Sequence, residues 1–465
     1  MPIQQRRADD FDFIIPVLIV GGGGCGLSAA LAARDGGAEV LVVERDPKPW
    51  GTTSMSTGLI PAAGTPEQAA QGIEDSPALF AADIQAKARG QADPVIVDHL
   101  ARQSAETVAW LKDGHGLPLT LVDGFTYPGH SVRRMYGMTH RSGAELMAKL
   151  EESAVSAGAD ILTDAVVTTL YTDGEVMTGV GVERPDGSME AIGCRALILA
   201  CCGFAGNADM VARYIPELDG AVFNGHPGNK GDAILWGLDL GAAIGDVAAY
   251  QGHGGLAVGH AVTINWPAIL EGGFQVNVRG ERFSDESKGY SEQAVKIIAQ
   301  PDHVAWTVFD QRCYDVMTQF EDFQQAIAAG AILMGQDITQ LASACRLPVG
   351  ALAGSFDEAE ASRATKPADR FGRQFLTDRP TLTAPFYAVK VTGALYHTQG
   401  GLEVDQDARV LRADGTPFPN LFAGGGAARG VSGSDAAGYI AGNGVLTATT
   451  LGKIAGRVAA AQVTG

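Results

Sequence analysis

A glycine-rich loop between two apolar segments constrains the fold of this chain more than any other feature. Residues 17–20 are apolar and mostly branched, which predicts a buried parallel strand. Gly21, Gly23 and Gly26 follow with the spacing G-x-G-x-x-G, and the Ala-rich residues 27–34 predict a helix. The order of these segments predicts the start of a β-α-β unit in an α/β fold.

An acidic residue ends the second strand of this unit. Residues 40–43 are again apolar, and Glu44 follows them. Glycine lets the backbone approach a pyrophosphate whose charge sits at the helix N-terminus, while the acid accepts hydrogen bonds from ribose hydroxyls. The predicted dinucleotide site consists of Gly21, Gly23, Gly24, Cys25, Gly26, Glu44 and Arg45. The alternative is a glycine-rich turn that packs a helix on a sheet and binds no ligand.

Composition limits the classes of partner. The chain has 465 residues, of which 46% are hydrophobic, so it is long enough for two or three domains with real cores. A net charge of −19 argues against nucleic acid or an anionic membrane as partner. The sequence contains no run of eighteen apolar residues, which a membrane span would need. Arg6 and Arg7 are followed by acids rather than by the apolar segment of a signal peptide. We therefore expect a cytoplasmic protein.

The six cysteines contain no C-x-x-C pair. Cys201 and Cys202 are adjacent at the end of an apolar strand, where buried thiols behave as small hydrophobic groups. Core positions are therefore expected for the cysteines, rather than redox or metal-binding roles.

Further segments are predicted to pass the dinucleotide site. Residues 161–173 predict a strand, and residues 196–200 predict a buried strand that runs into a glycine. Residues 79–113 and 229–243 have helical periodicity. The residues that we assign to the cofactor from these strands are Val166, Val167, Ala200 and Gly203.

The composition changes in the middle of the chain. From about residue 248 to 386 the sequence becomes more charged, with mixed strands and short helices. Residues 387–465 return to a strand, a Gly-rich loop and a long helix. We therefore expect one domain made of residues 1–247 and 387–465, interrupted by a second domain at residues 248–386.

Four stretches together resemble one flavoprotein family, which includes soluble fumarate reductases and 3-ketosteroid Δ1-dehydrogenases. They are VLIVGGGGCGLSAALAA with Glu44, GTTSMSTGLIPAAGT from Gly51, GGFQVNVRGERFSDES from Gly272, and HTQGGL from His397 with the C-terminal NLFAGGG…GNGVLTATTLGKIAG. The resemblance covers nearly the full chain. It implies a Rossmann-like FAD-binding domain interrupted by an α+β capping domain, with the active site between them.

The same resemblance implies FAD as cofactor, held without a covalent bond because no histidine lies at an evident attachment site. The loop from Gly51 is similar to the family loop under the isoalloxazine. At the C-terminal end, Gly442 to Gly444 open the final helix, whose free N–H groups and positive end would face the flavin pyrimidine. The alternative is a helix start without a ligand. The further cofactor residues implied are Thr52, Thr53, Ser54, Gly58, Gly425, Asn443, Gly444, Val445 and Leu446.

The chain departs from the fumarate reductases of this family at two positions. Those enzymes carry a proton-donating arginine shortly after the motif R-F-x-x-E, where this chain has Tyr290. They also carry an arginine for the substrate carboxylate in the C-terminal loop, where this chain has Tyr439. The ketosteroid dehydrogenases similarly have a tyrosine near each place. Gly425 replaces a family glutamate.

These tyrosines match the chemistry of ketone oxidation. A donor polarises the carbonyl oxygen, a base takes the α-proton, and the flavin takes the β-hydrogen as hydride. Tyr439 with the Gly442 N–H is the predicted donor. Tyr290 is the predicted base; a free tyrosine has a pKa near 10, so ionisation at pH 7 needs a shift of about three units, roughly 4 kcal/mol. Nearby groups that would assist are Lys288, Tyr127 and Tyr136.

Each candidate also has a structural interpretation. Tyr290 and Tyr439 fit ordinary buried tyrosines. His397 matches the histidine that binds carboxylate in fumarate reductases, but a single histidine is as often a structural residue.

Three functions remain open. The first is FAD-dependent α,β-dehydrogenation of a cyclic ketone, either a 3-ketosteroid or, given the short chain, a smaller oxocyclohexane, with oxygen, a quinone or another electron acceptor. The second is reduction of an unsaturated carboxylic acid, as in fumarate reductases. The third is a flavin-binding electron carrier, which the inserted domain disfavours.

Overall fold

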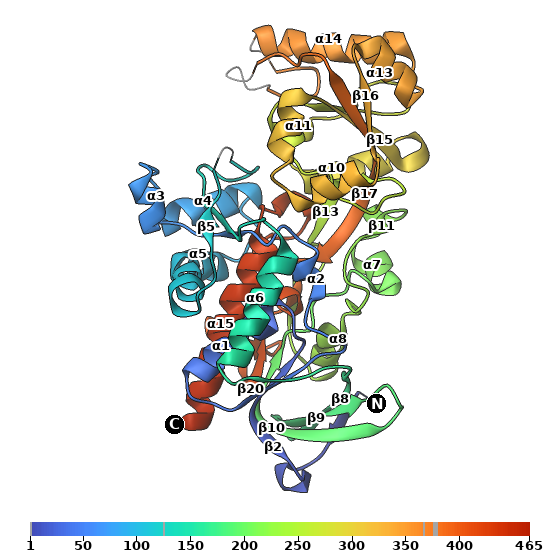
Figure 1. Ribbon diagram of the computed structural model, residues 1–465. Helices are drawn as coiled ribbons and strands as arrows, with labels where there is room; N and C mark the ends of the chain where they lie inside the picture. Colours follow the sequence, from blue (N-terminus) through green and yellow to red (C-terminus); the bar gives the residue numbers. More distant parts are fainter. Residues whose placement is uncertain (1, 124–125, 366–367, 375–379) are drawn as a thin grey trace. The chain divides into compact units, whose positions relative to one another are not determined.

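The computed structural model describes residues 2–123, 126–365, 368–374 and 380–465 (Figure 1). The chain divides into two compact units. The first contains Met1–Ile215, Gly225–Tyr250 and His397–Gly465, and the second contains Pro216–Asn224 and Gln251–Tyr396. The boundaries expected at residues 248 and 386, and the capping role of the second unit, stay predictions.

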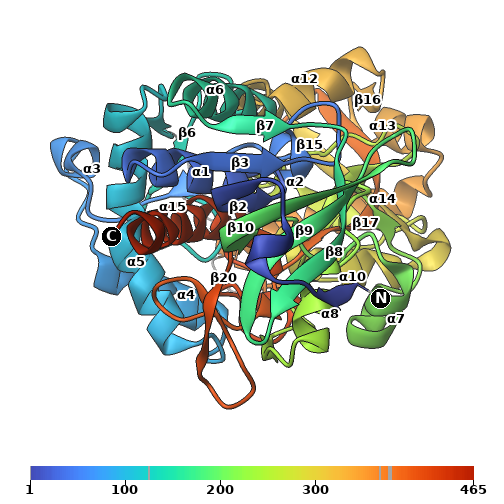
Figure 2. The ribbon, with the colours of Figure 1, turned by 90° about the horizontal axis from the view of Figure 1, so that it is seen from below.

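The first unit is built on a parallel sheet in which β10, β2, β3 and β7 are neighbours (Figure 2). The antiparallel strands β9 and β8 continue the sheet on one side, β1 lies at its edge, and β20 pairs in parallel with the end of β10. These strands are β1 (Ile3–Gln5), β2 (Ile14–Val20), β3 (Val40–Val43), β7 (Asp160–Leu162), β8 (Val166–Asp173), β9 (Val176–Glu183), β10 (Met189–Leu199), β19 (Arg409–Leu411) and β20 (Pro417–Ala423). The predicted α/β fold with a β-α-β start is confirmed.

Helices α1 (Gly24–Asp35) and α15 (Asn443–Thr464) pack against each other next to this sheet. Their backbones approach closely because two glycines of α15 face α1. A Cβ on Gly452 would lie 2.4 Å from the Cys25 carbonyl oxygen, and one on Gly456 would lie 2.1 Å from that of Ala29. The other elements of this unit are α2 (Gly51–Ser54), α3 (Pro66–Ala70), α4 (Pro77–Lys87), α5 (Pro94–Ala109), α6 (Gly143–Ser156), α7 (Ala208–Tyr214), α8 (Asp232–Asp239), β4 (Ile60–Pro61), β5 (Thr120–Leu121), β6 (Met135–Gly137), β12 (Ile244–Gly245) and β18 (Gly401–Leu402).

Two predicted helices differ from the structure. The helix expected at residues 229–243 is shorter, because Gly231 has φ +82° and acts as the N-cap of α8, and α8 ends at Asp239. The segment 79–113 is not continuous: α4 ends at Lys87, and α5 starts anew after Asp93, whose carboxylate accepts hydrogen bonds from the N–H groups of Val95 and Ile96.

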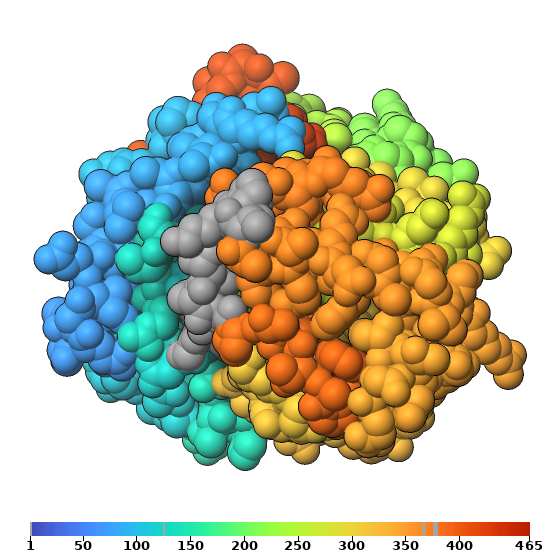
Figure 3. Space-filling model, turned by 90° about the horizontal axis from the view of Figure 1, so that it is seen from above, coloured from blue at the N-terminus to red at the C-terminus, as the bar shows by residue number. Residues whose placement is uncertain are grey.

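The second unit is built on a sheet with the order β11, β17, β15, β14, in which β13 and β16 also pair with β17. Strands β15 and β17 pair in antiparallel along the whole of β15. Its elements are β11 (Val222–Phe223), β13 (Tyr250–Ala257), β14 (Phe274–Val276), β15 (Val304–Asp310), β16 (Ile332–Gly335), β17 (Phe386–Thr398), α9 (Pro267–Leu270), α10 (Tyr290–Ile298), α11 (Gln311–Met317), α12 (Glu321–Ala328), α13 (Ile338–Cys345) and α14 (Val349–Thr365). Tyr250 at the start of β13 and residues 397–398 at the end of β17 are counted with the first unit. Helices α13 and α14 form part of the orange surface in Figure 3.

None of the helices within the described ranges combines the length and the apolar character that a membrane crossing requires.

Candidate active site

A pocket opens at the carboxyl ends of β2, β3 and β10, all in the first unit. The empty space inside it measures about 780 Å3, including the part open to solvent. Twelve of the predicted cofactor residues line this pocket: Gly21, Gly23, Gly24, Cys25, Glu44, Arg45, Thr52, Thr53, Val166, Val167, Ala200 and Gly425. The place where a dinucleotide site is expected in a doubly wound sheet is therefore hollow.

The glycines of the loop have different structural roles. Gly21 has φ +103°, and a Cβ there would lie 2.6 Å from the Ala200 carbonyl oxygen. A Cβ on Gly26 would lie only 1.8 Å from the Gly21 carbonyl oxygen, so Gly26 permits the tight turn into α1. At Gly23, the N-cap of α1, a Cβ would meet no atom within 4 Å. Gly23 therefore leaves open space in front of the helix N-terminus.

Glu44 is buried at the end of β3, and two backbone N–H groups hold its carboxylate. Gly22 N–H donates to Oε2 at 2.6 Å, and Asp46 N–H donates to Oε1 at 2.9 Å. Burial raises the pKa of Glu44, and these two hydrogen bonds act in the opposite direction. A carboxylate has about four acceptor positions, so two remain to accept from ribose hydroxyls.

FAD, the cofactor that the resemblance implies, fits these residues. The open space at Gly23 lies at the N-terminal end of α1, where backbone N–H groups and the helix dipole favour a pyrophosphate. The carboxylate of Glu44 is fixed with free acceptor positions beside it.

A second group of residues closes one side of the pocket. His226 Nε2 lies 2.7 Å from Asp46 Oδ2, and Trp50 Nε1 donates to the same oxygen at 2.9 Å. Gly228 N–H donates to His226 Nδ1 at 3.0 Å, so this nitrogen is an acceptor. Arg45 donates to the Gly228 carbonyl oxygen at 2.8 Å. These contacts tie residues 45–50 to residues 226–228.

Sequence reasoning missed this group and other residues of the pocket. For Cys201 and Cys202, which were expected in the core, a signal was present, because they follow β10 directly and so stand at the carboxyl edge of the sheet. Both are half-buried. For His226 and its neighbours the sequence gives no signal, because they lie far from Glu44 in the chain. The pocket residues not predicted are Val20, Val43, Asp46, Gly51, Ala165, Cys201, Cys202, His226, Gly228, Asn229, Asp232, Trp236, Gly426 and Ala448.

Eight predicted cofactor residues do not line the pocket. Among them, a Cβ on Gly203 would lie 2.0 Å from Thr398 Oγ1, and one on Gly58 (φ +64°) would lie 3.0 Å from Gly143 Cα, so both glycines allow close packing. Their contacts with a cofactor stay predictions. The eight are Gly26, Ser54, Gly58, Gly203, Asn443, Gly444, Val445 and Leu446.

The C-terminal candidates gather at the start of α15. Gly442 is its N-cap, with φ +79°, as expected for a helix opened by this loop. The ring of Tyr439 packs edge to face against His397, with centroids 5.9 Å apart. Tyr127 is half-buried, and its carbonyl oxygen accepts from the His130 N–H at 3.1 Å.

His130 joins the Tyr127 loop to the loop before α15. Its Nε2 lies 2.9 Å from the Ala441 carbonyl oxygen, and its ring stacks on Phe80 at 5.8 Å. Burial, with Arg134 nearby, lowers the pKa of His130 to about 4. The neutral ring therefore donates from Nε2 to the residue before Gly442.

Stability is expected to fall in acid because of His130. The unfolded chain takes up a proton below pH 6.5, whereas the folded chain does so only near pH 4, so stability is lost as pH falls through this window. The expected slope is at most about 1.4 kcal/mol per pH unit. Urea unfolding of the wild type and of His130→Gln at pH 7 and pH 5 measures it, and the variant should lose less. Equal losses would contradict this assignment.

In the second unit, Tyr290 is the first residue of α10 and is buried. Its ring stacks on His253 at 4.7 Å and packs against Trp266 at 6.0 Å. His253 also stacks on Tyr396 at 5.3 Å. Burial lowers the pKa of His253 to about 3, so Tyr290 packs against a neutral imidazole.

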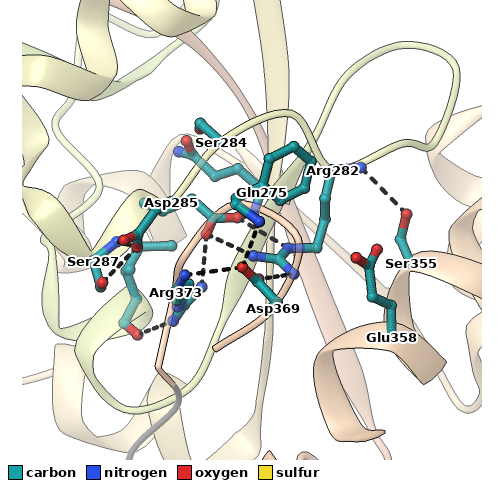
Figure 4. A network of polar contacts seen from close by, with 12 residues as sticks. Gln275, Arg282, Ser284, Asp285, Ser287, Ser355, Glu358, Asp369 and Arg373 are labelled. Carbon is teal, nitrogen blue, oxygen red and sulfur yellow. Dashed lines mark hydrogen bonds and ion pairs between the residues drawn. The ribbon is translucent and has the colours of Figure 1, made fainter. Parts of the chain in front are cut away.

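A buried network of charges holds the segment that leads to Tyr290 (Figure 4). Glu286 accepts from Arg282 at 3.1 Å and from Arg373 at 2.9 Å, and Arg282 lies 2.6 Å from Asp369. Burial raises the pKa of Glu286, but the two arginines together hold it below its ordinary value. The motif R-F-x-x-E thus forms a fixed support four residues before Tyr290.

Glu44→Gln is expected to weaken FAD binding about 10- to 100-fold, because one acceptor oxygen becomes a donor that opposes a backbone N–H, at roughly 1.5–3 kcal/mol. Titration of the apoprotein with FAD measures the affinity. The exposed Glu39→Gln, which removes the same charge, should leave it unchanged. Unaltered binding by Glu44→Gln would contradict the assignment of Glu44.

Comparisons with known proteins agree with the dinucleotide pocket described above. A family model described as FAD binding domain matches residues 16–445. A probable fumarate reductase of Shewanella frigidimarina (strain NCIMB 400) is 31% identical over 451 residues, covering 96% of this chain and 74% of the relative.

Two solved structures are also similar. The open conformation of a flavocytochrome c3 fumarate reductase has a TM-score of 0.80 at 28% identity and covers 98% of this chain and 80% of that one. The 3-ketosteroid-Δ4-(5α)-dehydrogenase of Rhodococcus jostii RHA1, in complex with 4-androstene-3,17-dione, has a TM-score of 0.75 at 25% identity and covers 98% and 99%. The chain therefore belongs to the FAD-binding family of flavin-dependent oxidoreductases that act on CH–CH bonds, with fumarate reductases and ketosteroid dehydrogenases among its relatives.

Proposed function

We propose that this flavoprotein oxidises a cyclic ketone to the α,β-unsaturated ketone. The observation that carries the proposal is Tyr290, which stands eight residues after Arg282 of the R-F-x-x-E motif, where the resembling fumarate reductases have their arginine. A tyrosine supplies a phenol that accepts or donates a proton, but it supplies no permanent positive charge for a carboxylic acid substrate.

The C-terminal loop also lacks a free cation. Between residues 424 and 444 the sequence contains a single arginine, Arg429. Its guanidinium donates to Asp246 at 2.7 Å, and to Asp93 and Glu403 at 3.3 Å each. Three carboxylates thus neutralise Arg429, which supports a ketone substrate over a dicarboxylate.

Each step of the oxidation has a candidate group in the chain. The Tyr439 hydroxyl and the Gly442 N–H donate to the carbonyl oxygen and stabilise negative charge that develops there. Tyr290 accepts the proton from the α-carbon, and the electron pair of that bond forms the new C=C bond. Bound FAD would supply the acceptor for the β-hydrogen and its two electrons. His397 and Tyr127 are assigned to the substrate side of the site, and the FAD is held without a covalent bond.

The groups packed around Tyr290 are aromatic and neutral, which supports an uncharged ring at this place. We assign a small oxocyclohexane ahead of a 3-ketosteroid. The electron acceptor is oxygen, a quinone or another carrier.

Product analysis tests this function. The purified protein is incubated with an artificial electron acceptor and with 4-oxocyclohexanecarboxylate, cyclohexanone or a 3-ketosteroid in turn. The expected product is the conjugated enone, two hydrogens lighter by mass spectrometry. Absence of an enone from all three ketones would contradict the proposal.

The second candidate function is reduction of an unsaturated carboxylic acid. It is favoured by the identity with the Shewanella fumarate reductase and by His397, which matches the carboxylate-binding histidine of those enzymes. Fumarate added to the reduced protein separates the two candidates, since only the reductase forms succinate.

A further inference from the structure

A chain of polar side chains connects the start of α15 to His397. Asn443 Nδ2 donates to Ser432 Oγ at 2.8 Å, and Ser432 Oγ donates to Gln399 Oε1 at 3.2 Å. Gln399 Nε2 lies 2.8 Å from His397 Nδ1. Asn443, Ser432 and Gln399 are buried, and all four residues belong to the first unit.

The hydrogen bond from Asn443 to Ser432 sets one direction for this series of side chains. Asn443 is the first residue of α15, and its amide group faces Ser432, while its side-chain oxygen has no hydrogen-bond partner among the described residues. The serine hydroxyl donates a hydrogen bond to Gln399 Oε1, which leaves the Gln399 amide group facing His397 Nδ1. With this donor in front of it, Nδ1 is an acceptor.

The N-terminal end of α15 also favours a neutral His397 ring. A Cβ on Gly444 would lie 2.7 Å from His397 Cε1 and 3.0 Å from Nε2, so the ring lies against the first turn of α15. The positive end of a helix disfavours a second positive charge on the imidazole. Burial lowers the pKa of His397 to about 4.

We propose that Gln399 fixes His397 as the neutral tautomer with its proton on Nε2, so that the site offers a neutral hydrogen-bond donor, and not a cation, to its substrate. Gln399 is then a positioning residue that acts through His397. Ser432 orients Gln399 by a hydrogen bond, and Asn443 donates in turn to Ser432. Nε2 has no hydrogen-bond partner within the described part of the chain, which leaves its proton for a ligand. That the ligand atom is a ketone oxygen rests on the proposed function.

A neutral donor selects between substrate classes. A carbonyl oxygen accepts one hydrogen bond from Nε2–H and needs no counter-charge. A carboxylate placed against a neutral ring loses hydration without gaining an ion pair, which costs free energy. The chain of hydrogen bonds therefore explains how a histidine in a fumarate-reductase-like position serves a ketone.

In the competing arrangement, the hydrogen bonds between these four side chains run in the opposite direction. His397 Nδ1 also lies 3.3 Å from the Thr398 carbonyl oxygen. A ring protonated on Nδ1 would donate there and to a Gln399 amide turned by 180°. The two arrangements place the proton on different nitrogens, so they are distinguishable without any turnover.

Nitrogen NMR of the FAD-loaded protein labelled with 15N-histidine tests the proposal. The chain has nine histidines, and His397→Gln identifies the signals of His397. At pH 7 we expect Nε2 protonated and Nδ1 unprotonated. Gln399→Glu, which has only acceptors, should move the proton to Nδ1 or protonate both nitrogens. Gln399→Met, which has no donor, should give a mixture of tautomers.

The matched control is Gln336→Glu, an exposed site in the second unit, which should leave the His397 signals unchanged. Protonated Nδ1 in the wild type would overturn the proposal. A pure Nε2–H tautomer in Gln399→Met would also overturn it, because Gln399 would then not be the cause. If the tautomer is as expected but no ketone is oxidised, the proposed function alone is wrong.

Discussion

Replacing Tyr290 with phenylalanine is expected to lower kcat for a cyclic ketone by roughly 10²- to 10⁴-fold, the usual contribution of a positioned proton acceptor. The change removes one hydroxyl and keeps the ring, so the stacking on His253 at 4.7 Å remains possible. Steady-state kinetics under saturating acceptor measure the loss. KM should change much less, because the base acts in the transition state rather than in substrate binding.

Two controls accompany this variant. Tyr314→Phe removes a hydroxyl elsewhere in the second unit, where the ring packs on Phe323, and should leave kcat unchanged. In the wild type, the rate should rise toward alkaline pH as a tyrosine base ionises. A Tyr290→Phe variant with wild-type kcat, or a pH–rate profile that is flat, would contradict a tyrosine base.

Replacing Glu286 with alanine is expected to destabilise the second unit by about 3–5 kcal/mol, the cost of breaking a buried ion pair by removing one partner. The carboxylate is shared by Arg282 and Arg373, so both guanidinium groups lose an acceptor inside the protein. Chemical unfolding followed by tryptophan fluorescence measures the loss, since Trp266 and Trp306 lie in this unit.

Glu281→Ala is the matched control, because Glu281 lies in the same segment but is exposed, and its replacement should change stability by no more than about 0.5 kcal/mol. Glu286→Gln keeps the shape and part of the hydrogen bonding, so an intermediate loss is expected. Equal stability of Glu286→Ala and Glu281→Ala would show that the network does not support this segment.

The sequence predicted those parts of the site that lie within one local unit. The glycine loop and Glu44 belong to one strand, helix and strand in sequence order, so spacing alone indicates their geometry. Gly442 was predictable for the same reason, because the loop 442–444 and the helical segment that it opens are adjacent in the sequence. The ends of α8 were not, because the conformation of Gly231 decides where that helix begins.

Contacts between segments that lie far apart in the chain could not be predicted from the sequence. The side of the pocket closed by His226 and Asp46 joins residues 180 positions apart. The chain from Asn443 to His397 likewise depends on how the strand end at Gln399 faces the start of α15. No periodicity or motif encodes such pairings, since each depends on the packed fold.

Anaerobic spectroscopy of the bound flavin tests the central claim, oxidation of a ketone, most directly. Addition of 4-oxocyclohexanecarboxylate, cyclohexanone or a 3-ketosteroid to the oxidised protein should bleach the visible flavin band with at least one of them, and the ketone that does so identifies the substrate class. If no ketone bleaches the flavin, and fumarate or another enoate reoxidises the dithionite-reduced protein, the claim is contradicted and the protein is a reductase.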